Sequence, residues 1–474
     1  MSEIKVNKIS PRTNCGTVTL GDSGDTITIP SGVTITNSGT AAGFGSTGEV
    51  SWDTTPKTGD FTGVSGVGYF INSGGGAVIV TLPGSPSAGN VVAVSDYNGT
   101  AATNAITIAR NGSNINGSAT NLSIAKANSA VQLVYVDATT GWQGVTTASP
   151  TDITSEFIVA TGGTETTSGD FRIHTFTGPG TFAVTAGSCT SNNEVSYIVV
   201  GGGGAGGTGV EGISSVGSGG GGAGGFRERR AANDSYTVSP LNGATPITVT
   251  SQSYPITVGA GSVGRASSPT QCTGNNPQGG PSTFSTVTSA GGGYGISRNG
   301  TPNCTQVGGA GGSGGGSAFG LSPNVGGAGN TPPVSPAQGT NGGLGSASSP
   351  SHPGGGGGGA TTVGEDALPH PAPGTGAAGG AGATTNITGS PVAYAGGGGG
   401  GIGNPGGPPG SGGSGGGGAG AGYPPTTSGD GSAGTANTGG GGGGAASGGL
   451  MGGTVSLKGG NGGSGVVIIR YKFQ

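Results

Sequence analysis

Runs of consecutive glycine are the feature that most restricts what this chain can fold into. Six glycines in a row occur at residues 354–359, 396–401 and 439–444, and shorter runs fill much of the sequence between them. Glycine has no Cβ and loses more conformational freedom on folding than any other residue. An ordered structure built from such runs therefore needs close approaches between backbones that only glycine permits.

A flexible linker is the alternative to an ordered structure. The 474 residues include 119 glycines and 29 prolines, above the roughly 25–30% typical of low-complexity chains. Disordered segments, however, usually carry many charges and few β-branched residues. Only 7% of this chain is charged. The charged side chains between residues 266 and 457 are Arg298, Glu365, Asp366 and Asp430. This scarcity of charge favours an ordered glycine-rich body.

Polyglycine has an ordered form that suits these runs. It is an extended threefold helix, like polyproline II, with about 3.1 Å rise per residue and no internal hydrogen bonds. Because glycine lacks a Cβ, such helices can pack side by side and bond to one another through their backbones, with Cα–H···O contacts in support. Collagen's strict G-X-Y repeat is absent here, and glycine runs instead alternate with loops rich in Pro, Ser, Thr and Asn. We therefore predict a polyglycine II-like bundle, in which the runs are rods and the loops are turns at its two ends.

The pattern of the remaining residues predicts short strands, and no segment shows helical periodicity. The predicted fold class is therefore all-β. Residues 1–48 are Thr/Val/Ile runs too short to be stable alone. We expect them to form a β-stem that closes its edges by intertwining with other copies in an elongated homotrimer. Residues 49–148 predict a sandwich-like or barrel-like module with Trp52 and Trp142 in its core. Residues 149–474 form the predicted glycine-rich domain.

Two apolar stretches frame the glycine-rich domain, at about 155–204 and 462–473. The sequence YIVV at 197–200 runs directly into glycine, and glycine runs directly into VVIIRY at 466–471. We therefore expect the two stretches to pair in one sheet, with the glycine-rich segment as a long excursion. The basic cluster Arg227, Arg229 and Arg230 around Glu228 is expected to be a solvated turn.

Several functional classes have little support. The formal net charge is −4 with no basic stripe, so nucleic acid is not an expected partner. No stretch approaches 18 apolar residues and the N-terminus lacks an apolar core, which predicts neither membrane insertion nor a signal peptide. The four cysteines form no CxxC pair, so zinc and other cofactors are not expected. Cys272 and Cys304 are compatible with a disulfide or with free thiols.

Enzymatic chemistry is also not expected. The many G-x-G-x-x-G matches follow from composition, and none follows a buried strand and opens a helix. Glycoside cleavage needs two facing carboxylates, whereas the side chains of the neighbours Glu365 and Asp366 point apart on an extended chain. His174 lies in the alternating stretch FRIHTF and is expected to be structural.

Three segments carry a resemblance to known proteins. The opening MSEIKVNKISPRTNCGTVTLGDSGDTITIPSGVTITNSG resembles the N-terminus of tail-fibre proteins from phages of marine bacteria. The stretch from TLPGSPSAGNVVAVSDYNGT to LVYVDATTGW is similar to a module of phage fibres and tailspikes. FTGPGTFAVTAG, SYIVVGGGGAGG, YPITVGAGS and GGSGVVIIRYKF resemble the glycine-rich domain at the ends of many phage fibres. The glycine-run-and-loop pattern is also similar to the adhesins of T-even-like phages. The resemblance implies a trimeric virion protein, made in the bacterial cytoplasm, whose distal part binds the bacterial surface.

The resemblance implies two functional regions. The charged N-terminus would dock on a tail or adaptor protein of the virion, and its candidate residues are Glu3, Lys5, Lys8 and Arg12. The loops of the glycine-rich domain would act as a receptor-binding adhesin for a host outer-membrane protein or surface polysaccharide. Its candidate residues are Tyr294, Phe319, His352, His370, Tyr394 and Tyr423. Flat aromatic faces suit such ligands, although packing of these rings against the rods is an equal expectation. A non-adhesive connector or head decoration protein and a polysaccharide-degrading tailspike are the alternative functions.

Overall fold

The computed structural model divides the chain into two contact units, Met1–Glu49 and Val50–Gln474. The predicted stem at residues 1–48 lies outside the part of the chain that the structure describes. The described residues are 50–145, 154–155, 157–187, 193–209, 216–266, 277–297, 307–318, 324–346, 352–367, 374–403, 406–423, 429–446 and 457–474. They form strands and extended segments, with one 3₁₀ turn, η1 (Thr100–Ala102), and no α-helix among them. The predicted all-β class is confirmed.

Two five-stranded sheets make up the first module. One has the order β1 (Ser51–Lys57), β3 (Val67–Ile71), β5 (Val91–Asp96), β8 (Ala130–Asp137) and β9 (Gly141–Val145). The other has the order β10 (Thr154–Ser155), β7 (Leu122–Ile124), β6 (Ile106–Ala109), β4 (Val78–Thr81) and β2 (Phe61–Thr62). Neither sheet closes into a barrel. Their shared core includes Ile71, Leu133 and Trp142, each with none of its surface exposed.

The strands of this module do not follow one another as simple antiparallel hairpins. The chain alternates between the sheets, so that β1, β3 and β5 pair in parallel in one sheet and β2, β4 and β6 pair in parallel in the other. The prediction that Trp52 is a core residue is wrong. Its side chain is 40% exposed, because it lies in the edge strand β1 and turns away from the core.

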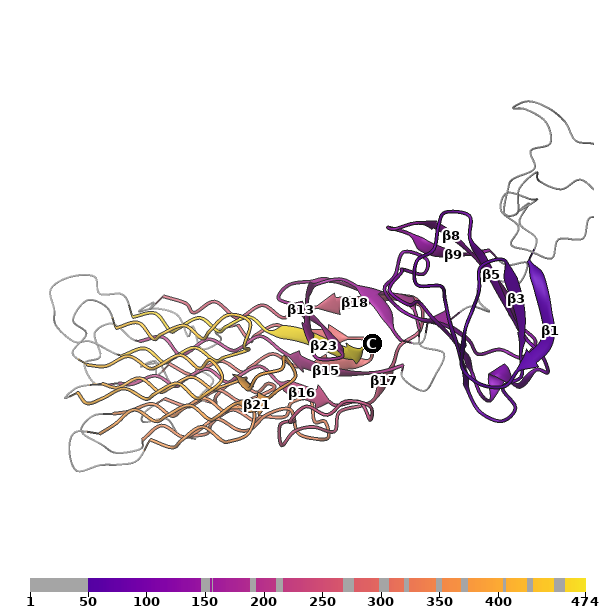
Figure 1. The fold of residues 1–474 in the computed structure, drawn as a ribbon. Helices are drawn as coiled ribbons and strands as arrows, with labels where there is room; N and C mark the ends of the chain where they lie inside the picture. The colour runs from indigo at the N-terminus through magenta and orange to yellow at the C-terminus, as the bar shows by residue number, and fades with distance from the viewer. Residues whose placement is uncertain are drawn as a thin grey trace, which may run out of the picture. The chain divides into compact units, whose positions relative to one another are not determined.

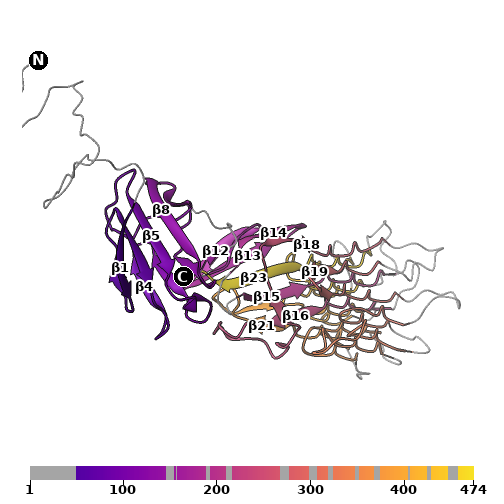
Figure 2. The same ribbon diagram turned by 90° about the vertical axis from the view of Figure 1, so that its right-hand side faces the viewer.

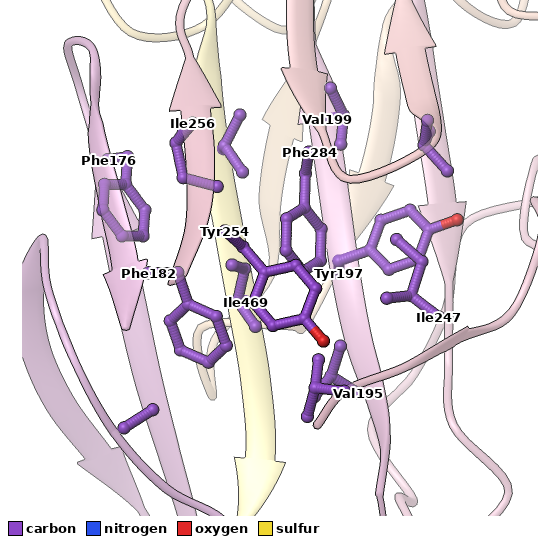
Figure 3. Close-up of a cluster of buried hydrophobic side chains, with 14 of the residues drawn as sticks. Phe176, Phe182, Val195, Tyr197, Val199, Ile247, Tyr254, Ile256, Phe284 and Ile469 are labelled. Carbon is purple, nitrogen blue, oxygen red and sulfur yellow. The ribbon is translucent and has the colours of Figure 1, made fainter. Parts of the chain in front are cut away.

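The glycine-rich domain also begins with two sheets. The first has the order β11 (Val159–Thr161), β14 (Gly180–Ala186), β18 (Gln252–Thr257), β19 (Ser282–Phe284) and β20 (Val287–Ser289). The second has the order β12 (Thr164–Ser168), β13 (Phe171–Phe176), β23 (Val466–Lys472), β15 (Glu194–Val200) and β16 (Phe226–Arg229), with β17 (Ile247–Thr248) paired to β15. Aromatic and aliphatic side chains from both sheets form the core that Figure 3 shows around Phe182, Tyr254 and Phe284.

The two framing stretches pair as the sequence predicts. β15 and β23 are antiparallel, with Ser196 opposite Arg470 and Val200 opposite Val466. β13 pairs with the other edge of β23, so the C-terminal strand lies inside the sheet (Figure 1). Because Val466–Tyr471 are buried on both faces, this strand is a nearly continuous apolar run without polar alternation.

A bundle of glycine rods extends from the sheets (Figures 1 and 2). The central rod, residues 216–225, donates backbone hydrogen bonds to three neighbours in strict rotation. Gly217, Gly220 and Ala223 donate to rod 352–360, Ser218, Gly221 and Gly224 to rod 439–446, and Gly219, Gly222 and Gly225 to rod 290–297. Its carbonyls accept from rods 201–209, 313–318 and 395–403. The repeat of three and the mutual bonding are those predicted for packed polyglycine helices.

The longest glycine runs occupy the most crowded places. All three six-glycine runs lie in rods that contact the central rod. A Cβ on Gly357, Gly398 or Gly441 would lie 2.0 Å from a carbonyl oxygen of a neighbouring rod. Rods at the edge of the bundle tolerate side chains on one face, and there the exposed positions recur every third residue, as at Val325 and Ala328.

The cluster around Glu228 is not a solvated turn, and that prediction is wrong. Arg227 and Glu228 belong to β16 and are 6% and 0% exposed. The Arg227 guanidinium donates to the carbonyls of Pro336 and Ser335. Glu228 accepts hydrogen bonds from the Thr385 hydroxyl at 2.5 Å and the Ser239 N–H at 2.8 Å. The Arg227 guanidinium and the Glu228 carboxylate both bond to groups that are distant in sequence. Local composition therefore could not predict that these two side chains are buried.

Candidate functional site

The outer end of the rod bundle is the candidate site. The rods begin at the sheets, since rod 201–209 continues β15 and rod 457–465 leads into β23, and they end at the side of the bundle opposite the sheets (Figures 1 and 2). The segments that follow these rod ends in the sequence lie outside the described residues. They are 210–215, 267–276, 298–306, 319–323, 347–351, 368–373, 404–405, 424–428 and 447–456.

Large apolar side chains are buried near these outer rod ends. They are Val216, Ile296, Ile402 and Leu457, each with at most 2% of its surface exposed. Their backbones are also held, since the Leu457 carbonyl accepts a hydrogen bond from Gly209 and the Ile402 N–H donates to Ala421. The sequence analysis missed these residues. The available signal was that several glycine-rich rods place a single aliphatic residue at their outer end.

Two predicted receptor-binding residues lie at the outer end. His352 begins rod 352–360 in a left-handed conformation, with φ of 45°, and its carbonyl accepts a hydrogen bond from Gly217. Tyr423 ends rod 417–423 and forms an isolated β-bridge with Gly407. Both side chains are half-buried, so each is held by the bundle and also reaches its surface.

Two other candidates have different surroundings. Tyr294 lies within rod 290–297, and its ring packs on Gly309, where a Cβ would lie 2.7 Å from the ring. Burial raises the pKa of the Tyr294 hydroxyl. Tyr394 lies in β22 (Val392–Tyr394), which pairs with β21 (Ala383–Thr385). This residue is 6% exposed and belongs to the core beneath the second sheet, where burial raises its pKa to about 12.

The prediction that Tyr394 contributes to the receptor-binding surface is therefore wrong, because Tyr394 packs in a core at the sheet end of the rods. Phe319 and His370 lie outside the described residues, as do the virion-attachment candidates. The latter are Glu3, Lys5, Lys8 and Arg12. All four cysteines, including Cys272 and Cys304, also lie outside the described part of the chain.

His174 has the surroundings of a structural residue. It is fully buried, with Nδ1 2.6 Å from the Gly162 carbonyl and Nε2 3.0 Å from the Tyr471 hydroxyl. Its ring stacks on Tyr471 with 5.5 Å between ring centroids. Burial lowers its pKa, although the Gly162 carbonyl and Glu165 oppose the shift. Within the described ranges, no three His, Cys, Asp or Glu side chains gather where a metal ion could be held.

A comparison with models of protein families finds one match for this chain. Residues 175–472 match the model of a glycine-rich domain. The chain therefore belongs to this family of glycine-rich domain proteins. No curated protein matches the sequence. In the part of the chain that the structure describes, no helix has the length and apolar character needed to cross a membrane.

Proposed function

We propose that this protein is a bacteriophage tail-fibre protein that attaches the virion to the surface of its bacterial host. The outer end of the glycine-rod bundle is the receptor-binding surface. The observation that carries the proposal is the bundle itself, in which rods bonded to one another along their length all end on the side away from the sheets. Binding residues are commonly found on loops that a rigid scaffold positions.

The bundle suits this role because of how its stability arises. Its rods are held mainly by backbone hydrogen bonds, which do not depend on the sequence of the connecting segments. The cost of longer loops grows only slowly with loop length. The connections can therefore vary in length and composition while the rods keep their positions, as recognition of different receptors requires.

His352 and Tyr423 are the described residues placed to contact a receptor. A tyrosine offers a flat apolar face and a hydroxyl at low entropic cost, and the ligand is a surface polysaccharide or an outer-membrane protein. The proposed assembly is a homotrimer joined to a tail or adaptor protein through residues 1–48. Several weak contacts per fibre then add up to tight attachment through avidity.

Binding to the bacterium on which the phage grows tests the proposal. The labelled full chain is compared with Tyr423→Ser and His352→Ser variants, and each is tested for competition with virions for host cells. Ser390→Ala is the matched control, because Ser390 is exposed in the turn between β21 and β22, at the sheet end of the rods. We expect the outer-end variants to bind more weakly while melting at the wild-type temperature, and the control to bind normally.

Two results would count against this function. Purified protein that fails to compete with virions would indicate a non-adhesive connector or decoration protein. Release of reducing sugars from host polysaccharide would indicate a tailspike enzyme. If competition is observed but Tyr423→Ser and His352→Ser bind normally, these two side chains do not contact the receptor.

A further inference from the structure

Three aromatic side chains form a strip on the outer face of the first module. Trp52 lies in β1, Phe70 in β3 and Tyr97 directly after β5. Trp52 and Tyr97 are 40% and 54% exposed, and Phe70 is half-buried. The Trp52 and Phe70 ring centroids are 4.8 Å apart with planes at 30°, and the Phe70 and Tyr97 centroids are 6.4 Å apart. Because β1, β3 and β5 are adjacent, the three rings cross the sheet as one surface.

Gly68 sets the orientation of the indole. It is the β3 partner of Trp52, and a Cβ on it would lie 2.7 Å from Cδ2 and 2.9 Å from Cε2 of the indole. The six-membered ring of Trp52 therefore lies directly on the β3 backbone. The β3 backbone and the stacked Phe70 ring together hold the indole in place, and Trp52 still leaves 40% of its surface exposed. A flat ring held in this way is a preformed stacking surface.

Uncharged polar side chains lie beside the strip at its Tyr97 end. Beside Tyr97, the Asn98 amide donates to Asn72 Oδ1 at 3.1 Å and accepts from the Thr100 hydroxyl at 2.8 Å. Amides and hydroxyls can both donate and accept hydrogen bonds. Flat rings flanked by such groups suit an uncharged ligand that carries many hydroxyls.

The size of the strip argues against a second protein as its occupant. An aromatic side chain offers about 150–250 Å², so the exposed parts of the three rings amount to roughly 250 Å². A stable protein interface buries about 800 Å² on each partner. The strip is therefore too small for a stable contact between two copies, whereas it matches a few sugar rings.

We propose that Trp52, Phe70 and Tyr97 form a binding platform for a neutral glycan. The C–H faces of pyranose rings stack on Trp52 and Tyr97, while hydroxyls at the edge of the glycan bond to Asn72 and Asn98. This site lies on the first module and is separate from the outer end of the rods. It does not depend on the attachment function proposed above.

Tryptophan fluorescence provides a direct test on the full chain. Of the two tryptophans, Trp142 is fully buried, so quenching by acrylamide reports mainly on Trp52. The probes are maltohexaose, cellohexaose and laminarihexaose, with a hexamer of polygalacturonic acid as the charged comparison. We expect at least one neutral hexasaccharide to protect Trp52 from acrylamide in a saturable manner, and the charged hexamer to protect it less.

Variants separate a stacking site from incidental protection. Trp52→Ala should abolish retardation of the protein in gels that contain the active polysaccharide. Tyr97→Ala, which keeps the tryptophan signal, should weaken binding by about tenfold. Ile79→Ala is the control, because Ile79 is also 40% exposed but lies in the other sheet, and it should bind as the wild type does.

Three outcomes would overturn the platform. The first is that none of the neutral hexasaccharides protects Trp52. The second is that Tyr97→Ala binds the protecting sugar with wild-type affinity. The third is that Trp52→Ala changes the sedimentation coefficient of the protein, which would make the strip an interface between copies.

Discussion

A single methyl group is the smallest change that tests the packing of the rods. A Cβ on Gly398 would lie 2.0 Å from the carbonyl oxygen of Gly442, and one on Gly399 would lie 2.1 Å from that of Gly410. Replacing glycine with alanine usually stabilises a chain by about 0.4–1 kcal/mol when the conformation allows it. Here we expect the double variant to be less stable by about 1–3 kcal/mol, as for overpacking of a tight interior.

Denaturant unfolding of the double variant measures this effect. Gly178→Ala is the matched control, because a Cβ there meets nothing within 4 Å and Gly178 has no positive φ. It should be neutral or slightly stabilising. A double variant as stable as the wild type would mean that the rods are loosely packed and that their outer ends are not a fixed surface.

His174 makes the stability of the glycine-rich domain depend on pH. The pKa of a histidine in an unfolded chain is about 6.5, and burial lowers that of His174 in the folded protein. The unfolded chain therefore binds more protons than the folded one near and below that value. The free energy of unfolding should fall as the pH is lowered from 7 through 6 to 5.

A His174→Gln variant should lose part of this pH dependence, measured as the difference in Tm between pH 7 and pH 5. His352→Gln removes a half-buried histidine at the outer rod ends and serves as the comparison. An unchanged pH slope in His174→Gln would show that other groups cause the acid sensitivity.

At the scale of the element, β23 holds the glycine-rich domain together. Its Arg470 is 5% exposed and donates through Nε to Asp234 at 2.9 Å, and the Ser196 hydroxyl of β15 donates to the same carboxylate. The guanidinium also lies over the ring of Phe171 in β13, 4.3 Å from its centroid. One side chain thus links β23 to both neighbouring strands and to the segment that follows β16.

Arg470→Met should destabilise the domain by about 3–5 kcal/mol, because it leaves the Asp234 carboxylate buried without its partner. Replacing both residues, as Arg470→Met with Asp234→Leu, should cost less than Arg470→Met alone, since paired removal leaves no buried charge. Unfolding in guanidinium chloride measures both. If the double variant is the less stable of the two, the network acts through its hydrogen bonds to Ser196 and not through charge compensation.

The sequence predicts elements better than it predicts their surroundings. The strand at 130–137 and the pairing of 197–200 with 466–469 follow from apolar patterns that are local and strong. The rods can be predicted from the glycine runs themselves, because a packed polyglycine helix is one of the few ordered structures that such runs can form. By contrast, the burial of Glu228 depends on Thr385, 157 residues away in sequence. The burial of Tyr394 likewise depends on which end of a rod it adjoins, and composition does not contain that information.

The candidate site was predicted only in part for the same reason. His352 and Tyr423 lie at the outer end because each adjoins a glycine run on one side and a connection on the other. Tyr394 has the same local pattern, yet its connection is the β21–β22 hairpin at the sheet end. A sequence of alternating runs and loops does not say which loops share an end until the direction of every rod is known.

At the scale of the whole molecule, the division after Glu49 leads to the last prediction. Met1–Glu49 forms a contact unit of its own, separate from Val50–Gln474. Since the strands predicted at residues 1–48 are too short to be stable singly, we expect this unit to hold the proposed trimer together. A chain of residues 50–474 should then melt at the temperature of the full protein but sediment as a monomer, while the full protein sediments as a trimer.

The same truncation separates assembly from adhesion. Residues 50–474 retain the outer rod ends, so they should still bind host cells, but more weakly than the full chain, because a monomer lacks the avidity of linked copies. They should also be absent from virions, because the proposed docking residues Glu3, Lys5, Lys8 and Arg12 have been removed. A truncated chain that still forms trimers would place the trimer contacts within residues 50–474. Normal incorporation into particles would place the virion-docking surface there as well, and the proposed polarity of the fibre would then be reversed.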